Sequence, residues 1–162
     1  MADPISEKIA VIVRSRVAAI STGAGYETTV SGAIRPRRIP TDRPKDYQVV
    51  VTQGDKVHNV TQSHAGNPPA KAWDFPFMIN AILLPQKTNT KSADTLKNIF
   101  EADITKSLTS VASWHTFGGN AITATIDAVT DYTSTDGGEA GFQVVLTVLF
   151  RVSEFDPYTL RT

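Results

Sequence analysis

Alternation of apolar and polar positions is the clearest pattern in this chain, and it lies near the C-terminal end. From residue 140 to residue 152 every even-numbered position is apolar, while the odd-numbered positions mix polar residues with Val145 and Leu149. Residues 122–132 show the same period of two, and the turn-forming sequence Ser-Thr-Asp-Gly-Gly at 134–138 separates the two segments. The pattern predicts a long antiparallel hairpin at the centre of a sheet, with the even-numbered side chains in the core.

Apolar residues at steps of three and four predict two helices. The first is expected from Pro4 to about Ser21, with Asp3 as its cap and a stripe from Ile5 to Ile20 on its buried face. The second is expected to follow Ser92 and to bury a stripe that reaches Trp114. Glycines at 23 and 25 and at 118–119 end the two segments.

The stretch between the two helices predicts four strands. They are expected over residues 26–34, 47–53, 57–64 and 73–83. The last has aromatic residues at 73, 75 and 77, which indicate a core position, whereas Pro76 predicts a sheet edge or a bulge. A loop with three prolines and five basic residues, 35–45, is expected to project between the first two strands.

Together these elements predict an α+β fold. Their order is α-β-β-β-β-α-β-β, with a mainly antiparallel sheet of five to six strands and both amphipathic helices on one face. We expect a single domain over residues 1–152. The apolar residues on the other face, including Ile82, Leu84, Val145 and Leu149, predict packing against a loop or another subunit.

Residues 153–162 are expected to be a C-terminal tail or arm, too short for another element. Phe155, Tyr158 and Leu160 in this tail are costly to leave in water. The tail is therefore expected to fold back on its own domain or to dock on a neighbouring copy.

Charge is balanced overall but is distributed unevenly along the sequence. From Arg14 to Lys45, seven basic residues face two acidic ones, a net charge of +5. From Asn120 to Thr162, six acidic residues face two basic ones, a net charge of −4. This pattern favours contact between copies, head to tail, over a grip on nucleic acid by the whole surface.

Composition excludes several kinds of chemistry. The 162-residue chain has no cysteine, which removes disulfides, thiolate zinc sites and cysteine nucleophiles. Its first residues lack a basic n-region, and no apolar run approaches the ~20 residues that cross a bilayer. We expect a protein without a signal peptide or membrane partner, made in a reducing cytoplasm.

A search for catalytic or metal-binding residues gives no site. His58 and His64 would be roughly 20 Å apart on an extended strand, too far to chelate one ion. Asp127 and Asp131, at roughly 13 Å on one strand face, exceed the spacing of paired glycosidase carboxylates. Phosphate-binding and nucleophile motifs are missing, and residues 131–139 lack the ligand pattern of a calcium loop. We predict no cofactor, no metal and no enzymatic activity.

One run of residues has a more specific likeness: Gly66-Asn67-Pro68-Pro69-Ala70-Lys71-Ala72-Trp73-Asp74-Phe75-Pro76-Phe77. Placed after an amphipathic helix and a Gly-Ala-Gly turn, this run resembles the tail terminator (tail completion) proteins of long-tailed bacteriophages. The resemblance implies a small α+β protein without catalytic residues. Such proteins form a ring, usually a hexamer, that caps the tail tube and presents a surface to the neck.

The resemblance leads to a set of expectations about partners and location. Copies of this chain, a tail tube protein and a neck or connector protein are the expected partners, at the tail–neck junction of the virion and in the host cytoplasm during assembly. The basic loop would contact a neighbouring ring or line a channel through which DNA passes without sequence specificity. The residues expected at such contacts are Arg35, Arg37, Arg38, Arg43, Lys45, Phe155, Tyr158 and Leu160.

Two alternatives remain open from the sequence. Another neck, connector or tube component fits the same physical arguments. A monomeric ligand-binding or enzymatic α+β domain, with a site formed by residues far apart in sequence, would require a deep polar pocket near His58, His64 or His115.

Overall fold

The computed structural model describes residues 3–35, 45–66, 69–84, 90–110, 112–133 and 140–161. It contains two α-helices, two 3₁₀ helices and a seven-stranded mixed sheet within these ranges. In chain order the elements are α1 (Ile5–Ala18), η1 (Thr22–Ala24), β1 (Gly32–Ile34), β2 (Gln48–Gln53), β3 (Val57–His58), β4 (Ala70–Leu83), α2 (Ala93–Thr109), η2 (Trp114–Thr116), β5 (Thr123–Thr133), β6 (Ala140–Ser153) and β7 (Asp156–Leu160).

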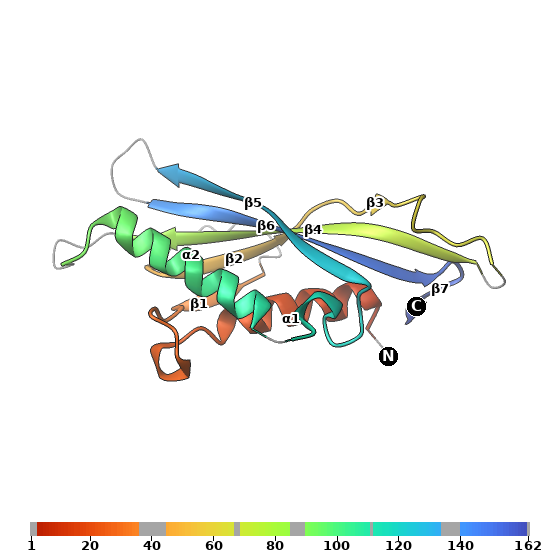
Figure 1. Cartoon of the computed structure of the whole chain (residues 1–162), viewed down its shortest axis with the longest axis horizontal. Helices are drawn as coiled ribbons and strands as arrows, with labels where there is room; N and C mark the ends of the chain where they lie inside the picture. The colour runs from red at the N-terminus through yellow and green to blue at the C-terminus, as the bar shows by residue number, and fades with distance from the viewer. Residues whose placement is uncertain are drawn as a thin grey trace.

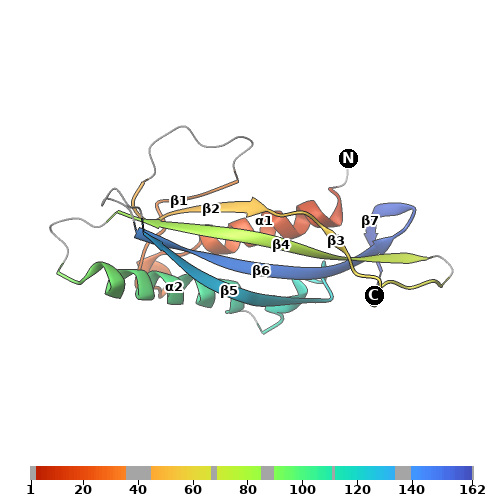
Figure 2. The ribbon, with the colours of Figure 1, turned by 90° about the horizontal axis from the view of Figure 1, so that it is seen from above.

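The sheet has the order β1-β2-β4-β6-β5, with β3 paired to β4 and β7 paired to β6. All of its pairs are antiparallel except β1 with β2. In Figure 1 the strands of the twisted sheet cross near the middle of the view, with α1 below them and α2 in front of their left-hand ends, and Figure 2 looks from above onto the face that the helices do not cover. The predicted α+β class and the placement of both helices on one face are confirmed.

The core lies between the helices and the inner face of β4 and β6. Alternate side chains of β6, from Phe142 to Val152, are buried, as the period of two predicted. Phe75, Phe77 and Ile79 of β4 are buried opposite them, so the aromatic stripe is core as expected. Five phenylalanine rings are fully buried here, each contributing a large apolar area to stability.

Both helices are shorter than the sequence predicted. Pro4 lies before the first helical residue of α1, where its carbonyl accepts from the N–H groups of Glu7 and Lys8. In α2, Ser92 is the cap as predicted, since its hydroxyl accepts from the backbone of Thr95, but the helix ends at Thr109. The buried stripes of both helices otherwise follow the predicted spacing.

Arg16 joins the end of α1 to the end of α2. Its guanidinium donates to the carbonyl of Leu108 at 2.8 Å and to that of Trp114 at 3.2 Å, and it lies over the ring of Phe117. One side chain therefore satisfies carbonyl groups that the end of α2 and the following turn leave without helical partners.

β4 is a central strand, so the prediction of an edge or bulge at Pro76 is wrong. The carbonyl of Pro76 accepts from the N–H of Gly54 at 2.9 Å. Because the backbone N and O of one strand residue face the same neighbouring strand, the nitrogen of Pro76 faces the same side as this carbonyl. The missing N–H of the proline therefore points to the gap where β2 has ended and β3 has not begun. The sheet loses no ladder hydrogen bond at this position.

The predicted hairpin exists, but it is not the centre of the sheet and its first strand contains a bulge. β5 lies at the edge, and the centre is the pairing of β4 with β6. The register shifts between Ile126 and Ala128, with Asp127 as the extra residue. Beyond the bulge Ala128 is opposite Val145 on the outer face, so the alternation predicted for this strand is interrupted.

Three other predictions about the strands need correction. Residues 26–31 are not a strand, because Asp103 binds this segment through Glu27 and Thr28, and only Gly32–Ile34 joins the sheet. The third predicted strand ends at His58, where the chain turns. The C-terminal segment forms β7 against β6 and does not remain an arm. The described residues thus contain seven strands, where five to six were predicted.

Candidate assembly interface

The ends of β4 and β6 that bear β3 extend past both helices (Figures 1 and 2). We term this end the tip and define it as residues 57–66, 69–71 and 154–155. It is built from β3 and the loop after it, the start of β4, and the turn between β6 and β7. The backbone N–H of Glu154 donates to the carbonyl of Pro69 at 3.1 Å and ties these strands together.

Exposed apolar side chains concentrate at the tip. Phe155 is 79% exposed, Val60 74% and Val57 60%, and these are the three most exposed large hydrophobic side chains among the described residues. Tyr158, just beyond the tip on β7, is 42% exposed. Exposed apolar residues that are clustered, in contrast to scattered ones, mark a surface that contacts another molecule.

The turn that carries Phe155 is held by several local contacts. The ammonium of Lys71 pairs with the carboxylate of Glu154 at 2.8 Å. Asp156 accepts from the hydroxyl of Thr159 and from the backbone N–H of Tyr158, and these hydrogen bonds lower the pKa of its carboxyl. The exposed phenylalanine is therefore presented by an ordered turn, which reduces the entropic cost of a contact.

A hollow of about 390 Å³ lies on the tip beside this turn. Its lining residues are His58, Val60, Ser63, His64, Ala65, Pro69, Ala70, Lys71 and Glu154. His58 shares a hydrogen bond with the hydroxyl of Ser63 and packs against the ring of Trp73. The separation of roughly 20 Å expected for His58 and His64 was wrong, because the chain turns at residues 60–62 and both imidazoles line one hollow.

Metal ligation is not indicated at the tip or elsewhere in the described ranges. No group of three or more histidine, aspartate or glutamate residues within them is placed to hold an ion. Asp127 accepts from the hydroxyl of Thr125, whereas Asp131 pairs with Lys97 of α2 at 2.6 Å. The two carboxylates thus have separate partners and do not form a paired site.

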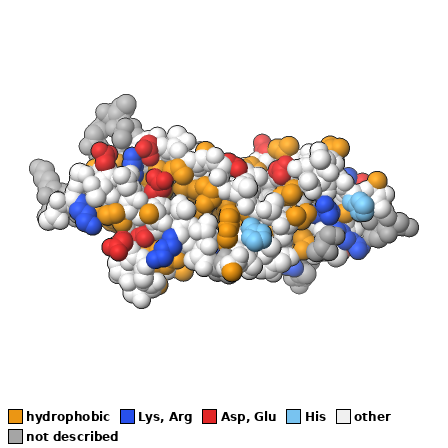
Figure 3. Space-filling model, in the orientation of Figure 1, with side chains coloured by type: hydrophobic (Ala, Val, Ile, Leu, Met, Phe, Trp, Pro, Cys, Tyr) orange, Lys and Arg blue, Asp and Glu red, His pale blue; other side chains and the backbone are white. Residues whose placement is uncertain are grey.

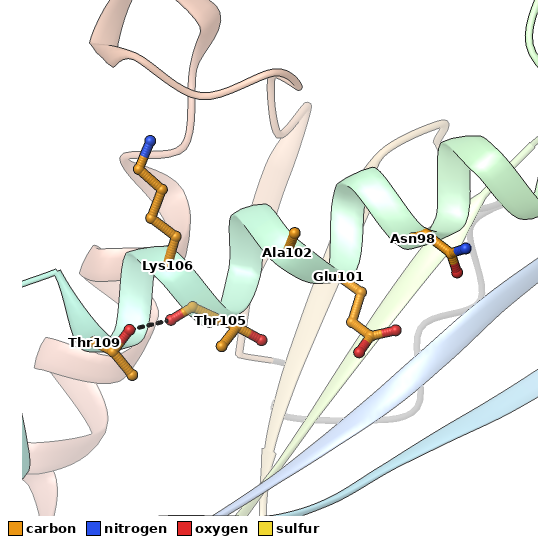
Figure 4. Close-up of a pocket in the computed structure, with 6 residues that line it drawn as sticks. All are labelled: Asn98, Glu101, Ala102, Thr105, Lys106 and Thr109. Carbon is orange, nitrogen blue, oxygen red and sulfur yellow. Dashed lines mark hydrogen bonds between the residues drawn. The ribbon is translucent and has the colours of Figure 1, made fainter.

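A second hollow, of about 600 Å³, lies along the outward side of α2 (Figure 4). It is lined by Asn98, Glu101, Ala102, Thr105, Lys106 and Thr109. Lys106 is directed away from Glu101 and donates to the carbonyl of Gly25, and Thr109 donates to the carbonyl of Thr105. Since the lining comes from one helix and its polar groups do not converge, this surface has no arrangement for chemistry.

The predicted basic loop is only partly within the described residues. Arg37, Arg38 and Arg43 lie outside them. Arg35 does not project, because its guanidinium forms two hydrogen bonds with the carboxylate of Glu7, at 2.7 and 3.0 Å. Lys45 is exposed.

Some of the unevenly distributed charges form internal contacts. Arg14 and Arg16 donate to backbone carbonyls, and Asp131 and Glu154 are paired with lysines. Acidic and basic side chains are neighbours over α2 and β5 (Figure 3). Charge segregation is therefore weaker on the described surface than it is along the sequence.

The contact residues predicted in the C-terminal segment differ in their placement. Phe155 and Tyr158 are exposed, as a contact requires, whereas Leu160 packs against the core and pairs with Val152. Val57 and Val60 were not predicted, since an exposed valine has the same local sequence pattern as a buried one.

The Arg35–Glu7 ion pair gives a prediction for acid stability. The hydrogen bonds from Arg35 lower the pKa of the Glu7 carboxyl below its ordinary value of 4.5. The pair therefore stabilises the fold above about pH 4.5, and this contribution is lost as the pH falls through the lowered pKa. Arg35→Gln should cost less than about 1 kcal/mol at pH 7, and the difference from wild type should vanish near pH 2.

Urea unfolding at several pH values measures this effect, with Lys45→Gln as the control because its charge is exposed. A difference between Arg35→Gln and wild type that stays constant from pH 7 to pH 2 would contradict the assignment.

No protein-family model matches the chain, and no curated protein sequence matches it. Within the described residues, no helix is long and apolar enough to cross a membrane.

Proposed function

We propose that this chain is a virion structural protein, a tail terminator that forms a homo-oligomeric ring at the head-proximal end of a phage tail tube. The ring, a hexamer by the resemblance, provides the joining surface to the neck. Its partners are copies of itself, the tube protein and a neck or connector protein, and DNA passes through its lumen without sequence-specific contacts. It works by assembly and not by catalysis, at the tail–neck junction and, before that, in the host cytoplasm.

The observation that carries the proposal is where the resembling run lies in the fold. Within the described residues, Pro69–Phe77 begins at the tip and continues as the first half of the central strand β4. The part of the sequence with the most specific likeness to tail terminators therefore coincides with the end that exposes Phe155, Val57 and Val60. A surface of this kind fits a protein whose role is contact with other chains.

The outer face of the sheet supports the same role. Met78, Ile82, Val145 and Leu149 lie on it, half-buried, and no helix of the described ranges covers it (Figure 2). The exposed edge of β5 lies at the side of this face. An apolar sheet face and an open strand edge are both surfaces through which chains assemble.

Electron microscopy of the purified protein tests the proposal. Closed rings with a constant number of subunits are expected. Single small particles at every concentration would contradict it. Because a neck, connector or tube component could also form rings, antibody labelling of intact particles, with a signal at the tail–neck junction, separates the terminator from these roles.

A second candidate function rests on the hollow at the tip. Two histidines, a lysine and a glutamate line it, so a monomeric ligand-binding domain would have its site there. Chemical shift perturbation of His58 and His64 by a small-molecule library, with a protein that stays monomeric, is the result that would favour this candidate over the ring.

A further inference from the structure

The tip has the features of a surface that is complementary to itself. Two of its exposed apolar side chains adjoin the hollow, because Val60 lines it and Phe155 directly follows the lining residue Glu154, and further apolar groups, including Ala65 and Pro69, line it as well. When two copies meet, the projecting aromatic residue of each copy can be buried in the apolar hollow of the other. A single patch that meets its own copy does so about a two-fold axis.

The charges of the tip fit the same arrangement. Lys71 and Glu154 form an ion pair whose side chains remain 43% and 35% exposed. A patch with one exposed charge of each sign is neutral, and a two-fold axis that passes between the two side chains places the lysine of one copy near the glutamate of the other. A partner of uniform charge would leave one of the two residues opposed by a like charge, whereas a second copy matches both.

We propose that two copies of this chain pair through their tips about a two-fold axis, with Phe155 of each copy packed against the hollow of the other. The two Lys71–Glu154 pairs then form one cluster of alternating charge at the contact. This pairing goes beyond the ring and does not depend on it, because a ring closes through head-to-tail contacts between different surfaces. In a protein that also forms rings, tip pairing joins two rings and doubles the mass.

Charge-reversal variants of Lys71 and Glu154 distinguish a contact between copies from a role of these residues in folding. Lys71→Glu places acidic residues at both positions, and Glu154→Lys places basic residues at both. Each variant alone should pair through the tip at least about tenfold more weakly than wild type, because like charges face each other across the axis. An equimolar mixture of the two variants should pair with an affinity within about threefold of wild type, since opposite charges then meet.

The pairing is measured by sedimentation velocity and by energy transfer between dyes. Gly23→Cys provides the labelling position, because the chain has no cysteine and no atom beyond the adjacent residues lies within 4 Å of a Cβ placed at Gly23. Lys97→Glu and Asp131→Lys reverse an ion pair of similar geometry away from the tip and serve as matched controls. These controls should leave pairing unchanged, and circular dichroism checks that every variant is folded.

Phe155→Ser supplies an independent result. Because Phe155 is 79% exposed, its loss should not affect folding, but it should weaken pairing about thirtyfold or more, as expected for a central aromatic contact. If the wild type forms rings, this variant should form rings of half the mass. Absence of rings in both proteins counts against the proposed function alone.

Three results would overturn the tip pairing. The first is a wild-type assembly with the same mass as that of Phe155→Ser. The second is a mixture of the two charge variants that pairs no better than either variant alone. The third is a tip that binds a different protein while the chain does not associate with itself.

Discussion

Replacement of Asp103 by alanine is expected to lower the free energy of unfolding by about 3 kcal/mol. Asp103 lies on α2 and is 4% exposed, and its carboxyl oxygens accept from the backbone N–H and the hydroxyl of Thr28, both at 2.7 Å. It also accepts from the N–H of Glu27 at 3.3 Å. Without the carboxyl, a buried backbone donor is left unsatisfied, and the segment that leads from α1 into β1 loses its attachment to α2.

Urea unfolding measures the loss, with Asp94→Ala as the matched control. Asp94 is exposed in the first turn of the same helix, so its removal should cost only about 0.5 kcal/mol through the helix dipole. Asp103→Asn retains one acceptor oxygen and should have an intermediate effect. A cost for Asp103→Ala that equals the cost for Asp94→Ala would refute the role of this carboxyl.

Gly141→Ala should destabilise the sheet by about 3 kcal/mol, at the upper end of the usual cost of overpacking. A Cβ at Gly141 would lie 2.3 Å from the carbonyl oxygen of Ala81 and 2.5 Å from the ring of Tyr132. The tyrosine crosses β6 at the glycine, and its hydroxyl donates to the carbonyl of Ala81 at 2.8 Å. The glycine thus provides the space in which β5 is linked to β4 across β6, and the close backbone atom cannot be relieved by a side-chain rotation.

Thermal and urea unfolding of Gly141→Ala should be compared with Gly23→Ala. No atom beyond the adjacent residues lies within 4 Å of a Cβ at Gly23, so that substitution should change stability by less than about 0.5 kcal/mol. Equal stability of the two variants would show that the crossing of Tyr132 over Gly141 does not exist as described.

Both residues illustrate what the sequence could not reveal. Asp103 follows Ile99 and Phe100 by four and three residues, so the helical spacing places it beside the apolar stripe of α2, but this spacing does not show that residues 27 and 28 lie against it. Gly141 interrupts a strand in which every even position is apolar, and its need for space arises from Tyr132 on another strand. Long-range contacts of this kind have no local signature.

The periodicity of apolar residues was the most reliable guide in segments with one face that is buried along its whole length. β6 and β4 follow the period of two because the helices cover the same face along most of their length. β5 departs from its predicted alternation at the bulge, where Asp127 adds one residue and reverses the faces. The stripes of α1 and α2 were predictable for the same reason as β6, since each helix packs one side against the sheet.

The candidate interface was predicted in part. An apolar C-terminal segment at Phe155 and Tyr158 indicated a contact, and both side chains are exposed. The tip as a unit was not predictable, because it combines β3, the start of β4 and the turn after β6, which are distant in sequence. The assumed extended strand from Val57 to His64 also concealed the turn that brings His58 and His64 to one hollow.

The central claim is that this protein functions by associating with copies of itself, and the mass in solution tests it most directly. Size-exclusion chromatography with light scattering, over a hundredfold range of concentration, should give a closed assembly whose mass is a fixed multiple of the 17.5 kDa chain. That multiple is six for one hexameric ring and twice as many for two rings paired through their tips. A mass of one chain at every concentration would contradict the account.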